Sequence, residues 1–405
     1  MTVKDVIETA GLRTTAGASE LAGHIPFRDA DAVARLRTAG AVIFGKTNTP
    51  PYAADYQTNN PLFGRTTNPW DAGRTPGGSA GGSAAALAAG HTSFELGSDL
   101  GGSIRIPAAN CGVFGLKPSH GIIPTRGHIP GPPGSLAEPE LATLGPLGRS
   151  ADDLDLGLAV LAGPDQRSGR AWRLELPGPR HATLGGYRLA VVFDDPYCPV
   201  DTTVVQVQTS LVATLRSAGA TIKETSPPAP LSETDPLYQQ TLAGVTAAFQ
   251  PPQAMDFYEG MVARAGPADT NPLTQWARWN LQTVRDWSFA REARAQLKVR
   301  WAAFFNQYDA LLCPVSNVLA IFHDDSPQPA LRTILVNGRP TPYLSQSNWS
   351  GLATVADLPA VAVPAGLTTA NLPVGVQVVA PYLEDRTAID IARHIERVVG
   401  RLTLI

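Results

Sequence analysis

The sequence predicts an α/β fold in which helices and strands alternate around a buried sheet. A helix over residues 29–38 precedes a short apolar strand over 41–44. Farther along, a strand over 188–193 is followed by a helix over 201–218 and a strand over 221–223. This alternation is typical of α/β proteins. With 405 residues, of which 43% are hydrophobic, the chain is long enough to bury a large core around such a sheet.

The other elements follow from apolar periodicity and from Gly and Pro, which mark turns. A strand tail over residues 1–3 ends at Lys4. We expect further strands over 310–314, 360–363 and 374–379, and helices over 83–89, 149–161, 387–399 and most of 237–308. Loops are expected over 50–76, 127–140 and 227–236, an irregular stretch over 316–345, and a candidate linker over 164–186.

Composition and charge exclude several classes of protein. A net charge of −3 argues against a basic surface for nucleic acid. The sequence has no run of 18 apolar residues for a membrane span and no apolar core of a signal peptide. The cysteines Cys111, Cys198 and Cys313 are odd in number and far apart, which disfavours a disulfide framework or a zinc site. We therefore expect a cytoplasmic protein with no nucleic-acid and no membrane partner.

Two Gly-Gly-Ser turns, ending at Ser79 and Ser103, flank a short helix-forming segment. Glycine lacks a Cβ atom and reaches positive φ easily, so backbone N–H groups can converge on a small volume. Converging amides can hold an anion or an oxyanion. Two such turns, each delivering a serine, predict nucleophilic serine chemistry without an obvious histidine.

Two other segments match known motifs letter by letter but lack the helices and strands that those motifs require around them. Residues 40–47 fit the phosphate-loop string G-x-x-x-x-G-K-T, yet a helix precedes them and Pro50 and Pro51 prevent a helix after them. Residues 77–81 fit the hydrolase string G-x-S-x-G, yet a loop rather than a strand leads into Ser79. None of the seven histidines lies in a recognisable partner motif. An ATPase and a Ser-His-Asp esterase are therefore disfavoured.

The motifs around Lys4, Ser79 and Ser103 resemble those of the amidase signature family. The resemblance covers nearly the whole chain and is densest over residues 1–126. Ala80 departs from it, because a second serine often stands there in the family. The matching motifs are Val3–Asp5 with Thr14–Thr15, Gly45–Asn48, Pro76–Gly82, Asp99–Arg105, Cys111–Pro118, Leu358–Ala360 and Leu372–Gln377.

The resemblance implies one α/β domain over residues 1–405, with a mixed central sheet sandwiched by helices. Residues 164–186 then form a surface connection rather than a linker. Relatives usually carry a helical segment before the lysine, and with three residues before Lys4 we expect this segment to be missing here. A lysine beside a free terminus is expected to fray.

The resemblance also implies a Ser–cis-Ser–Lys triad. A lysine has an ordinary pKa of about 10.4, so it acts as a base at neutral pH only where burial or nearby positive charge lowers that value. Asp99 and Arg105 are expected to hold the loop rather than to react. The implied roles are Lys4 as base, Ser79 as bridging serine on a cis peptide bond, Ser103 as nucleophile, and the N–H groups of Leu100, Gly101, Gly102 and Ser103 as oxyanion donors.

The leading functional hypothesis is an amidase that hydrolyses a carboxamide C–N bond of a small substrate through an acyl-enzyme on Ser103. One alternative is the glutaminase (A) subunit of a tRNA-dependent amidotransferase. Another is a catalytically impaired, ligand-binding relative. No metal or cofactor is implied, and the leading hypothesis pairs a small amide substrate with a chain that can form a homodimer. The pocket walls are expected from residues 50–60, 127–137 and the Trp-bearing helices.

Overall fold

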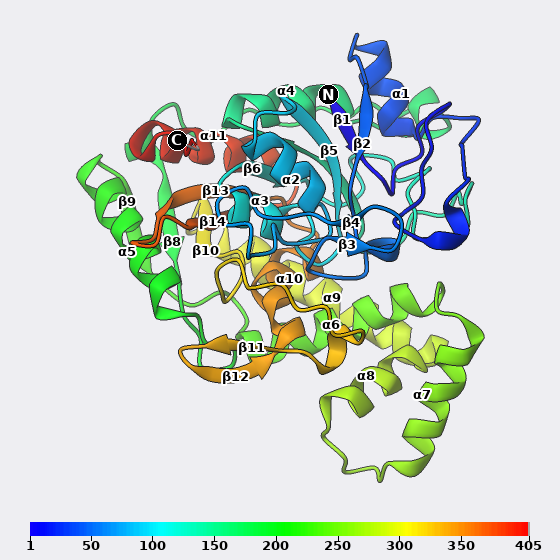
Figure 1. Ribbon diagram of the computed structural model, residues 1–405. Coiled ribbons are helices and arrows are strands. Elements are labelled where there is room, and N and C mark those ends of the chain that lie inside the picture. The colour runs from blue at the N-terminus through cyan, green and yellow to red at the C-terminus, as the bar shows by residue number, and fades with distance from the viewer. Residues whose placement is uncertain (404–405) are drawn as a thin grey trace.

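A ten-stranded mixed sheet runs through the centre of the protein (Figure 1). The computed structural model describes residues 1–403. The α/β class and the mixed central sheet expected from the sequence are confirmed. In sheet order the strands are β2 (Gly45–Thr47), β1 (Thr2–Lys4), β5 (Phe94–Asp99), β7 (Thr143–Gly148), β6 (Phe114–Lys117), β13 (Ala360–Leu367), β14 (Pro373–Val379), β10 (Ala310–Pro314), β8 (Arg188–Val191) and β9 (Thr221–Glu224).

The sheet is parallel at its two ends and antiparallel in the middle. β1 runs parallel to both β2 and β5, and β10, β8 and β9 are also parallel to one another. The strands between β5 and β10 pair antiparallel. Two small antiparallel pairs lie outside this sheet: β3 (Asn59–Asn60) with β4 (Gly64–Arg65), and β11 (Thr333–Val336) with β12 (Arg339–Pro342).

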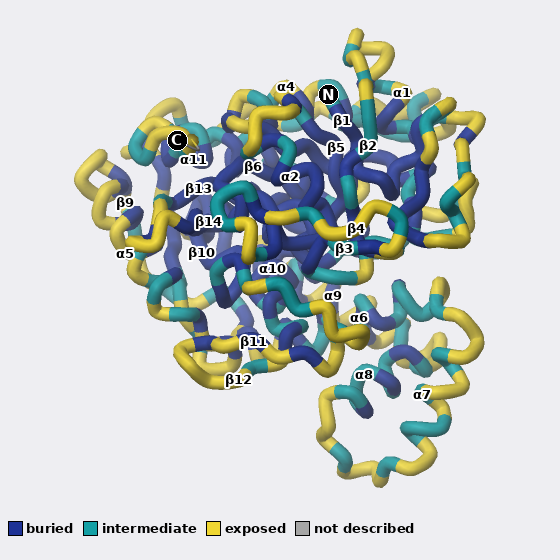
Figure 2. The backbone as a smooth tube through the Cα atoms, viewed as in Figure 1, coloured by how far each residue is buried: buried dark blue, intermediate teal, exposed yellow. Residues whose placement is uncertain are grey.

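Helices cover both faces of the sheet, as Figure 1 shows. One face carries α1 (Asp31–Thr38), α4 (Ala151–Leu161), α5 (Thr202–Ser217) and α11 (Asp385–Val399). The other carries α2 (Gly81–Ala88), α3 (Arg105–Cys111) and α10 (Asn348–Val355). The strands between the two layers are largely buried (Figure 2). Side chains of α2 and α3 form a separate apolar cluster with Leu147 and Ala362 of the sheet.

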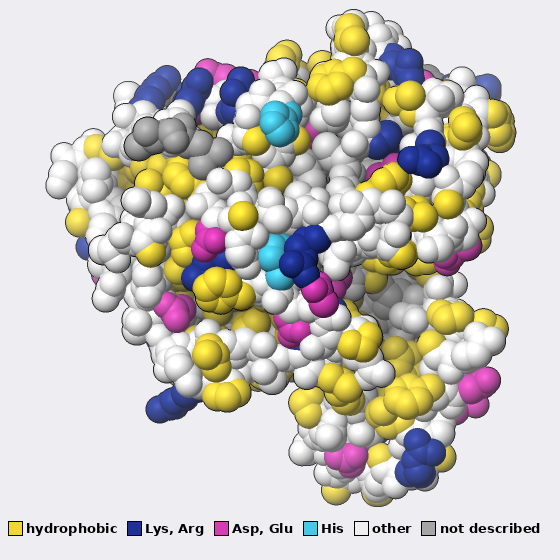
Figure 3. Space-filling model, in the orientation of Figure 1, with side chains coloured by type: hydrophobic (Ala, Val, Ile, Leu, Met, Phe, Trp, Pro, Cys, Tyr) yellow, Lys and Arg dark blue, Asp and Glu magenta, His cyan; other side chains and the backbone are white. Residues whose placement is uncertain are grey.

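A helical lobe, residues 231–304, lies beside the sheet. It consists of α6 (Leu231–Ala247), α7 (Pro252–Arg264), α8 (Pro272–Asn280) and α9 (Val284–Phe304). α6 packs on α10, whereas α7 packs on α8 at the outer side of the lobe. α7 has no buried residue, and apolar side chains gather on the surface of the outer part of the lobe (Figure 3).

Several expected elements differ in the structure. The strand expected over 41–44 is wrong: Val42 and Phe44 are 76% and 62% exposed, and the strand, β2, begins only after this range, at Gly45. The loop expected over 227–236 is shorter than predicted. Helix α6 already begins at Leu231, and Pro236 lies inside this helix, close to its start. β5, β7, α3 and the β11–β12 pair were not predicted from the sequence. No helix among residues 1–403 combines the length and the apolar character needed to cross a membrane.

The expected fraying at Lys4 is not seen, because β1 is an inner strand. Thr2, Val3 and Lys4 pair with β2, and Thr2 and Val3 also pair with β5. The Met1 ammonium donates a hydrogen bond of 2.8 Å to the carbonyl of Val42. These contacts hold Lys4 inside the sheet, on a strand that α2 packs against.

A glycine in α2 sets how closely this helix approaches β2. A Cβ atom added at Gly82 would lie 2.4 Å from the backbone nitrogen of Asn48. Because backbone cannot move aside as a flexible side chain can, we expect Gly82→Ala to lower the free energy of unfolding by about 1–3 kcal/mol, despite the better helix propensity of alanine. Guanidinium denaturation measures this change.

Gly178→Ala is the matched control, because a Cβ atom at Gly178 meets no atom within 4 Å. We expect its stability to stay within about 0.5 kcal/mol of the original chain. Equal stability of the Gly82→Ala and Gly178→Ala variants would show that the close approach of α2 to β2 is not a constraint.

Candidate active site

Lys4 and Ser79 are in direct contact inside the protein. The Lys4 Nζ atom lies 2.6 Å from Ser79 Oγ and 3.0 Å from Ser98 Oγ, and both side-chain oxygens accept from it. The Lys4 side chain is fully buried, and so is Ser79. Ser98 was not among the residues predicted from the sequence, although its place directly before the Asp99–Arg105 motif was a usable signal.

Burial lowers the pKa of Lys4 to about 7, while the negative charge of Asp99 acts in the opposite direction. The partners of Nζ are neutral oxygens rather than carboxylates. An ammonium group in such surroundings is poorly stabilised, so the amine form becomes accessible near neutral pH. Lys46, by contrast, has a carboxylate beside it, with Nζ 3.9 Å from Asp5 Oδ1, and it donates to Ile7 O and to the Thr14 and Thr9 hydroxyls, so it ties the 5–14 segment to β2.

Ser79 lies in a glycine-rich turn that packs closely against neighbouring backbone. The Gly78–Ser79 peptide bond is cis, as the family resemblance implies. A Cβ atom at Gly78 would lie 2.5 Å from Asp55 O, and Gly77 has a φ of +89°, which favours glycine. The turn therefore presses against the 55–57 backbone and directs Ser79 toward Lys4.

Ser103 lies in the same cavity as Ser79 but is not hydrogen-bonded to it within residues 1–403. Ser103 is 8% exposed and stands two residues before α3, while its carbonyl accepts from Ala80 N at 3.1 Å. This backbone bond ties the two Gly-Gly-Ser turns together. The structure thus brings Ser79 and Ser103 to one cavity, and Lys4 lies buried outside the cavity lining in direct contact with Ser79.

The backbone amides predicted as oxyanion donors divide into two groups. The Gly102 N–H is already engaged, because it donates to Asp99 Oδ1 at 2.8 Å. The N–H groups of Leu100, Gly101 and Ser103 donate to no protein acceptor in the described part of the chain. Gly102 has a φ of +94°, and a Cβ atom there would lie 2.7 Å from Ser350 Oγ. The loop therefore offers three free amides, not four, beside Ser103.

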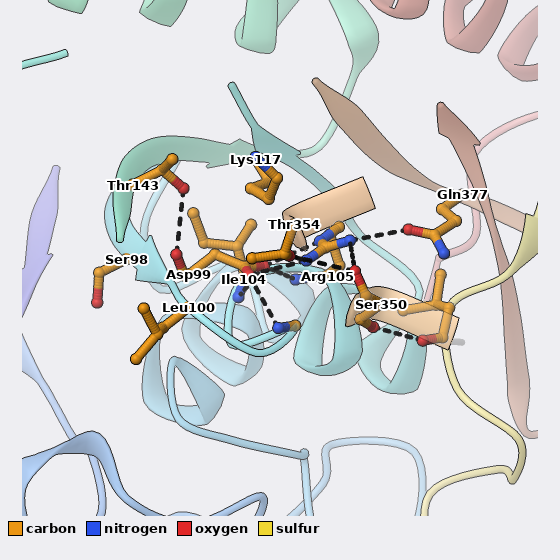
Figure 4. Close-up of polar contacts among 12 residues, drawn as sticks. Ser98, Asp99, Leu100, Ile104, Arg105, Lys117, Thr143, Ser350, Thr354 and Gln377 are labelled. Atoms are coloured by element: carbon orange, nitrogen blue, oxygen red, sulfur yellow. Dashed lines mark hydrogen bonds and ion pairs between the residues drawn. The ribbon is translucent and has the colours of Figure 1, made fainter. Parts of the chain in front are cut away.

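The loop is held by a buried ion pair between Asp99 and Arg105 (Figure 4). Arg105 Nη2 lies 2.9 Å from Asp99 Oδ1 and Arg105 Nε lies 3.0 Å from Oδ2, with both side chains completely buried. Burial raises the pKa of Asp99, but the charge and hydrogen bonds of Arg105 outweigh it and lower the pKa to about 2. The role expected for these two residues, holding the loop, fits this geometry.

Two tyrosines that were not predicted from the sequence lie behind the oxyanion loop. A Cβ atom added at Gly101 would lie 2.7 Å from Tyr238 Oη and 3.0 Å from Tyr56 Oη. The Tyr238 hydroxyl also donates to Leu100 O at 3.5 Å. Nothing local in the sequence marks these residues, because they come from α6 and from the loop after β2.

The cavity at Ser103 has a volume of about 90 Å³. This is smaller than the engineered protein cavity of about 150 Å³ that takes up benzene. Among residues 1–403, no Lys, Arg or Trp side chain lines it. The expected walls from residues 50–60 and 127–137 are present, but the expected tryptophans are not. The helical lobe contributes Phe249 instead; the apolar lining is Ala53, Ala54, Leu100, Pro130, Pro139, Ala142, Val245 and Phe249.

Comparison with known proteins identifies the family to which a chain with this fold and these motifs belongs. A model of the Amidase family matches residues 1–389. The chain belongs to the amidase signature family. The A subunit of the glutamyl-tRNA(Gln) amidotransferase of Saccharolobus solfataricus is 33% identical over 99% of this chain and 84% of its own length.

Solved structures of family members share the fold. The A subunit of glutamyl-tRNA(Gln) amidotransferase from Thermotoga maritima has a TM-score of 0.79 and 27% identity, and the match covers 98% of this chain and 83% of that one. A structure described as an amidase has a TM-score of 0.74 and 27% identity, over 98% of this chain and 84% of that one.

These relatives correct the expectation about partners. The sequence predicts a small amide as the partner, no nucleic acid, and at most a homodimer. Relatives of this chain are named as one subunit of an amidotransferase for glutamyl-tRNA(Gln). The prediction is therefore wrong, because the net charge of a whole chain averages over its surface and does not reveal which partners a local part of that surface contacts.

The buried ion pair gives a test of how the loop is held. Arg105→Leu leaves Asp99 as an unpaired buried carboxylate, so we expect the free energy of unfolding to fall by about 3–5 kcal/mol. Denaturation in guanidinium, followed by circular dichroism, measures the loss.

Arg216→Leu serves as the control, because Arg216 lies 3.5 Å from Glu224 in an exposed pair. It is expected to change stability by less than about 1 kcal/mol. If Arg105→Leu were no more destabilising than Arg216→Leu, the ion pair would not be what holds the loop.

Proposed function

We propose that this chain is the glutaminase (A) subunit of a glutamyl-tRNA(Gln) amidotransferase and that it releases ammonia from the side-chain amide of glutamine. The observation that supports this proposal is the similarity to relatives of that name, which extends over 99% of the chain at 33% identity. In this reading the hydrolytic site is complete within the chain, and partner subunits use the ammonia on a tRNA-bound substrate.

The chemical step uses Ser103 as nucleophile. Its Oγ attacks the amide carbonyl, while the N–H groups of Leu100, Gly101 and Ser103 stabilise the negative charge that develops on the carbonyl oxygen. The C–N bond then breaks, the nitrogen leaves with a proton as ammonia, and the acyl group stays on Ser103 as an ester. Water hydrolyses this ester and restores the free serine.

Lys4 and Ser79 move the proton. Neutral Lys4 accepts the proton of Ser79, which in turn takes the proton of Ser103 as it attacks. The 2.6 Å contact between Lys4 Nζ and Ser79 Oγ supports the first of these transfers. The second requires Ser79 and Ser103 to come within hydrogen-bond distance when substrate is bound, since catalytic contacts often tighten only in the complex.

A second candidate is a hydrolase of a small, uncharged carboxamide. The cavity lining favours it, because the described residues that form it include no Lys or Arg to pair with the carboxylate of glutamine. The volume of about 90 Å³ also suits a short acyl group. The two candidates share the Ser103 chemistry and differ in the charge of the amide that enters.

Ammonia release from L-glutamine and from butyramide distinguishes the two candidates. We expect the purified chain to release ammonia from L-glutamine, and Ser103→Ala to lose at least about 10³-fold in kcat/KM. A fluorophosphonate probe followed by mass spectrometry is expected to label Ser103. Ser217→Ala, which removes an exposed serine of α5, is the control and should behave like the original chain.

Faster turnover of butyramide than of L-glutamine would favour the second candidate. A chain that neither hydrolyses an amide nor reacts with the probe at Ser103 would contradict both and would support a non-catalytic, ligand-binding relative.

The pH dependence tests the base. Because burial lowers the pKa of Lys4 to about 7, the ammonium form predominates below that pH and cannot accept a proton. We expect kcat/KM to rise with pH through a midpoint near 7 and then to level off. Initial rates between pH 5.5 and 8.5 measure this profile.

Lys46→Gln is the matched control for this profile. The pKa of Lys46 is also lowered by burial, to about 8, but its amide replacement can still donate hydrogen bonds to Ile7 and Thr14. The midpoint should stay where it is. A rate that does not depend on pH in this range, or that falls as pH rises, would exclude Lys4 as the base.

A further inference from the structure

Seven polar side chains line the cavity at Ser103, and five of them already have hydrogen-bond partners. Tyr52 donates to Glu20, Ser79 and Ser98 accept from Lys4, Asp99 accepts from Arg105, and Thr246 donates to Leu242 O. Ser103 and His128 remain without a side-chain partner in the part of the chain that the structure describes. Ser103 is the proposed nucleophile, so His128 is the group that needs an explanation.

The backbone around His128 is firmly fixed. His128 N donates to Thr125 O at 3.0 Å, and His128 forms an antiparallel bridge with Ile7. The next residue, Ile129, donates its N–H to Val6 O at 2.8 Å. Val6 and Ile7 are separated from Lys4 only by Asp5, so the histidine is attached to the segment that carries the proposed base.

His128 as a whole is half-buried, but one of its ring nitrogens is buried without a protein partner among residues 1–403. Its Nε2 atom is inaccessible to solvent and makes no hydrogen bond there. Burial lowers the pKa of His128 to about 3, and the positive charge of Lys4 acts in the same direction. The ring is therefore neutral at ordinary pH, with one nitrogen that donates and one that accepts. A buried polar atom without a partner is unfavourable unless something else supplies the hydrogen bond.

We propose that His128 is a substrate-binding residue whose neutral imidazole hydrogen-bonds an uncharged polar group of the amide and orients that amide toward Ser103. The inference rests on the proposed function in one respect, namely that the amide is cleaved in this cavity. It assigns the cavity to an amide whose enclosed part is uncharged, because the imidazole is neutral and the carboxylate of Asp99, the charged side chain among the described lining residues, is already paired with Arg105.

Two other roles fit the observations less well. A base that replaces Lys4 would need a pKa near the working pH, which the burial of His128 prevents. It would also need a hydrogen bond to Ser79 or Ser103, and the His128 ring makes none to either serine within residues 1–403. A purely space-filling role leaves the unpartnered Nε2 atom without a reason, since leucine would fill similar space at no polar cost.

Binding and stability measured together test the proposal. Calorimetric titration of L-glutamine and of butyramide into the full-length Ser103→Ala protein gives Kd without turnover. Adding His128→Leu is expected to raise the Kd of the bound amide at least tenfold. The melting temperature of the ligand-free protein is expected to stay the same or to rise, because an unpartnered buried nitrogen has been removed.

Two further variants serve as controls. His128→Gln keeps one donor and one acceptor, and we expect it to recover most of the affinity. His91→Leu changes an exposed histidine outside the cavity and is expected to leave Kd unchanged.

Unchanged affinity in His128→Leu would overturn the proposal. So would a lowered melting temperature together with a loss of affinity that His128→Gln does not restore, since that pattern belongs to a structural residue. Failure of the Ser103→Ala protein to bind either amide would also overturn it. Absence of ammonia release by the original chain, with amide binding intact, would overturn the proposed function alone.

Discussion

The ion pair between Asp99 and Arg105 is the interaction on which the site depends. Arg105 also donates to Ser350 O and Thr354 Oγ1 of α10 and to Gln377 Oε1 of β14. Asp99 in turn accepts from the backbone N–H groups of Gly102 and Ile104. One buried pair of charges therefore joins the end of β5, the start of α3, α10 and β14, and fixes the turn that presents Ser103.

The same pair governs the electrostatics around the lysine. Asp99 is the carboxylate whose charge opposes the loss of a proton from Lys4. Since Arg105 binds both oxygens of Asp99, the carboxylate directs its hydrogen bonds toward the loop and not toward the lysine. Burial is then the stronger influence on Lys4, and the partners left to its Nζ atom are serine oxygens.

Much of this arrangement could be predicted from local sequence, and the reasons for the failures are physical. The Gly-Gly-Ser turns are local features, because positive φ and close backbone packing require glycine at fixed positions. The prediction of a strand over 41–44 was wrong because an apolar run does not reveal whether its side chains face the core. Val42 and Phe44 precede β2, the strand at the edge of the sheet, and their side chains are exposed. The early start of α6 was missed because Pro236 reads as a breaker, although it lies close to the helix start.

The site residues that the sequence did not reveal are those whose role arises from tertiary contacts. Tyr56 and Tyr238 approach Gly101 from elements far apart in the chain, and His128 lies in a loop rich in Pro and Gly. The engaged Gly102 N–H likewise depends on where the Asp99 carboxylate points. Single-sequence patterns carry periodicity and turn chemistry but not the distance between such groups.

The attachment of the 127–129 segment to residues 6–8 has a mechanical consequence. Two backbone bonds, Glu8 N to Gly127 O and Ile129 N to Val6 O, clamp one wall of the cavity onto the continuation of β1. The part of the protein that encloses the substrate and the part that supplies the proposed base consequently form a single rigid unit. A change in the backbone of this wall is therefore transmitted to the base, which restricts how far the wall can vary in sequence.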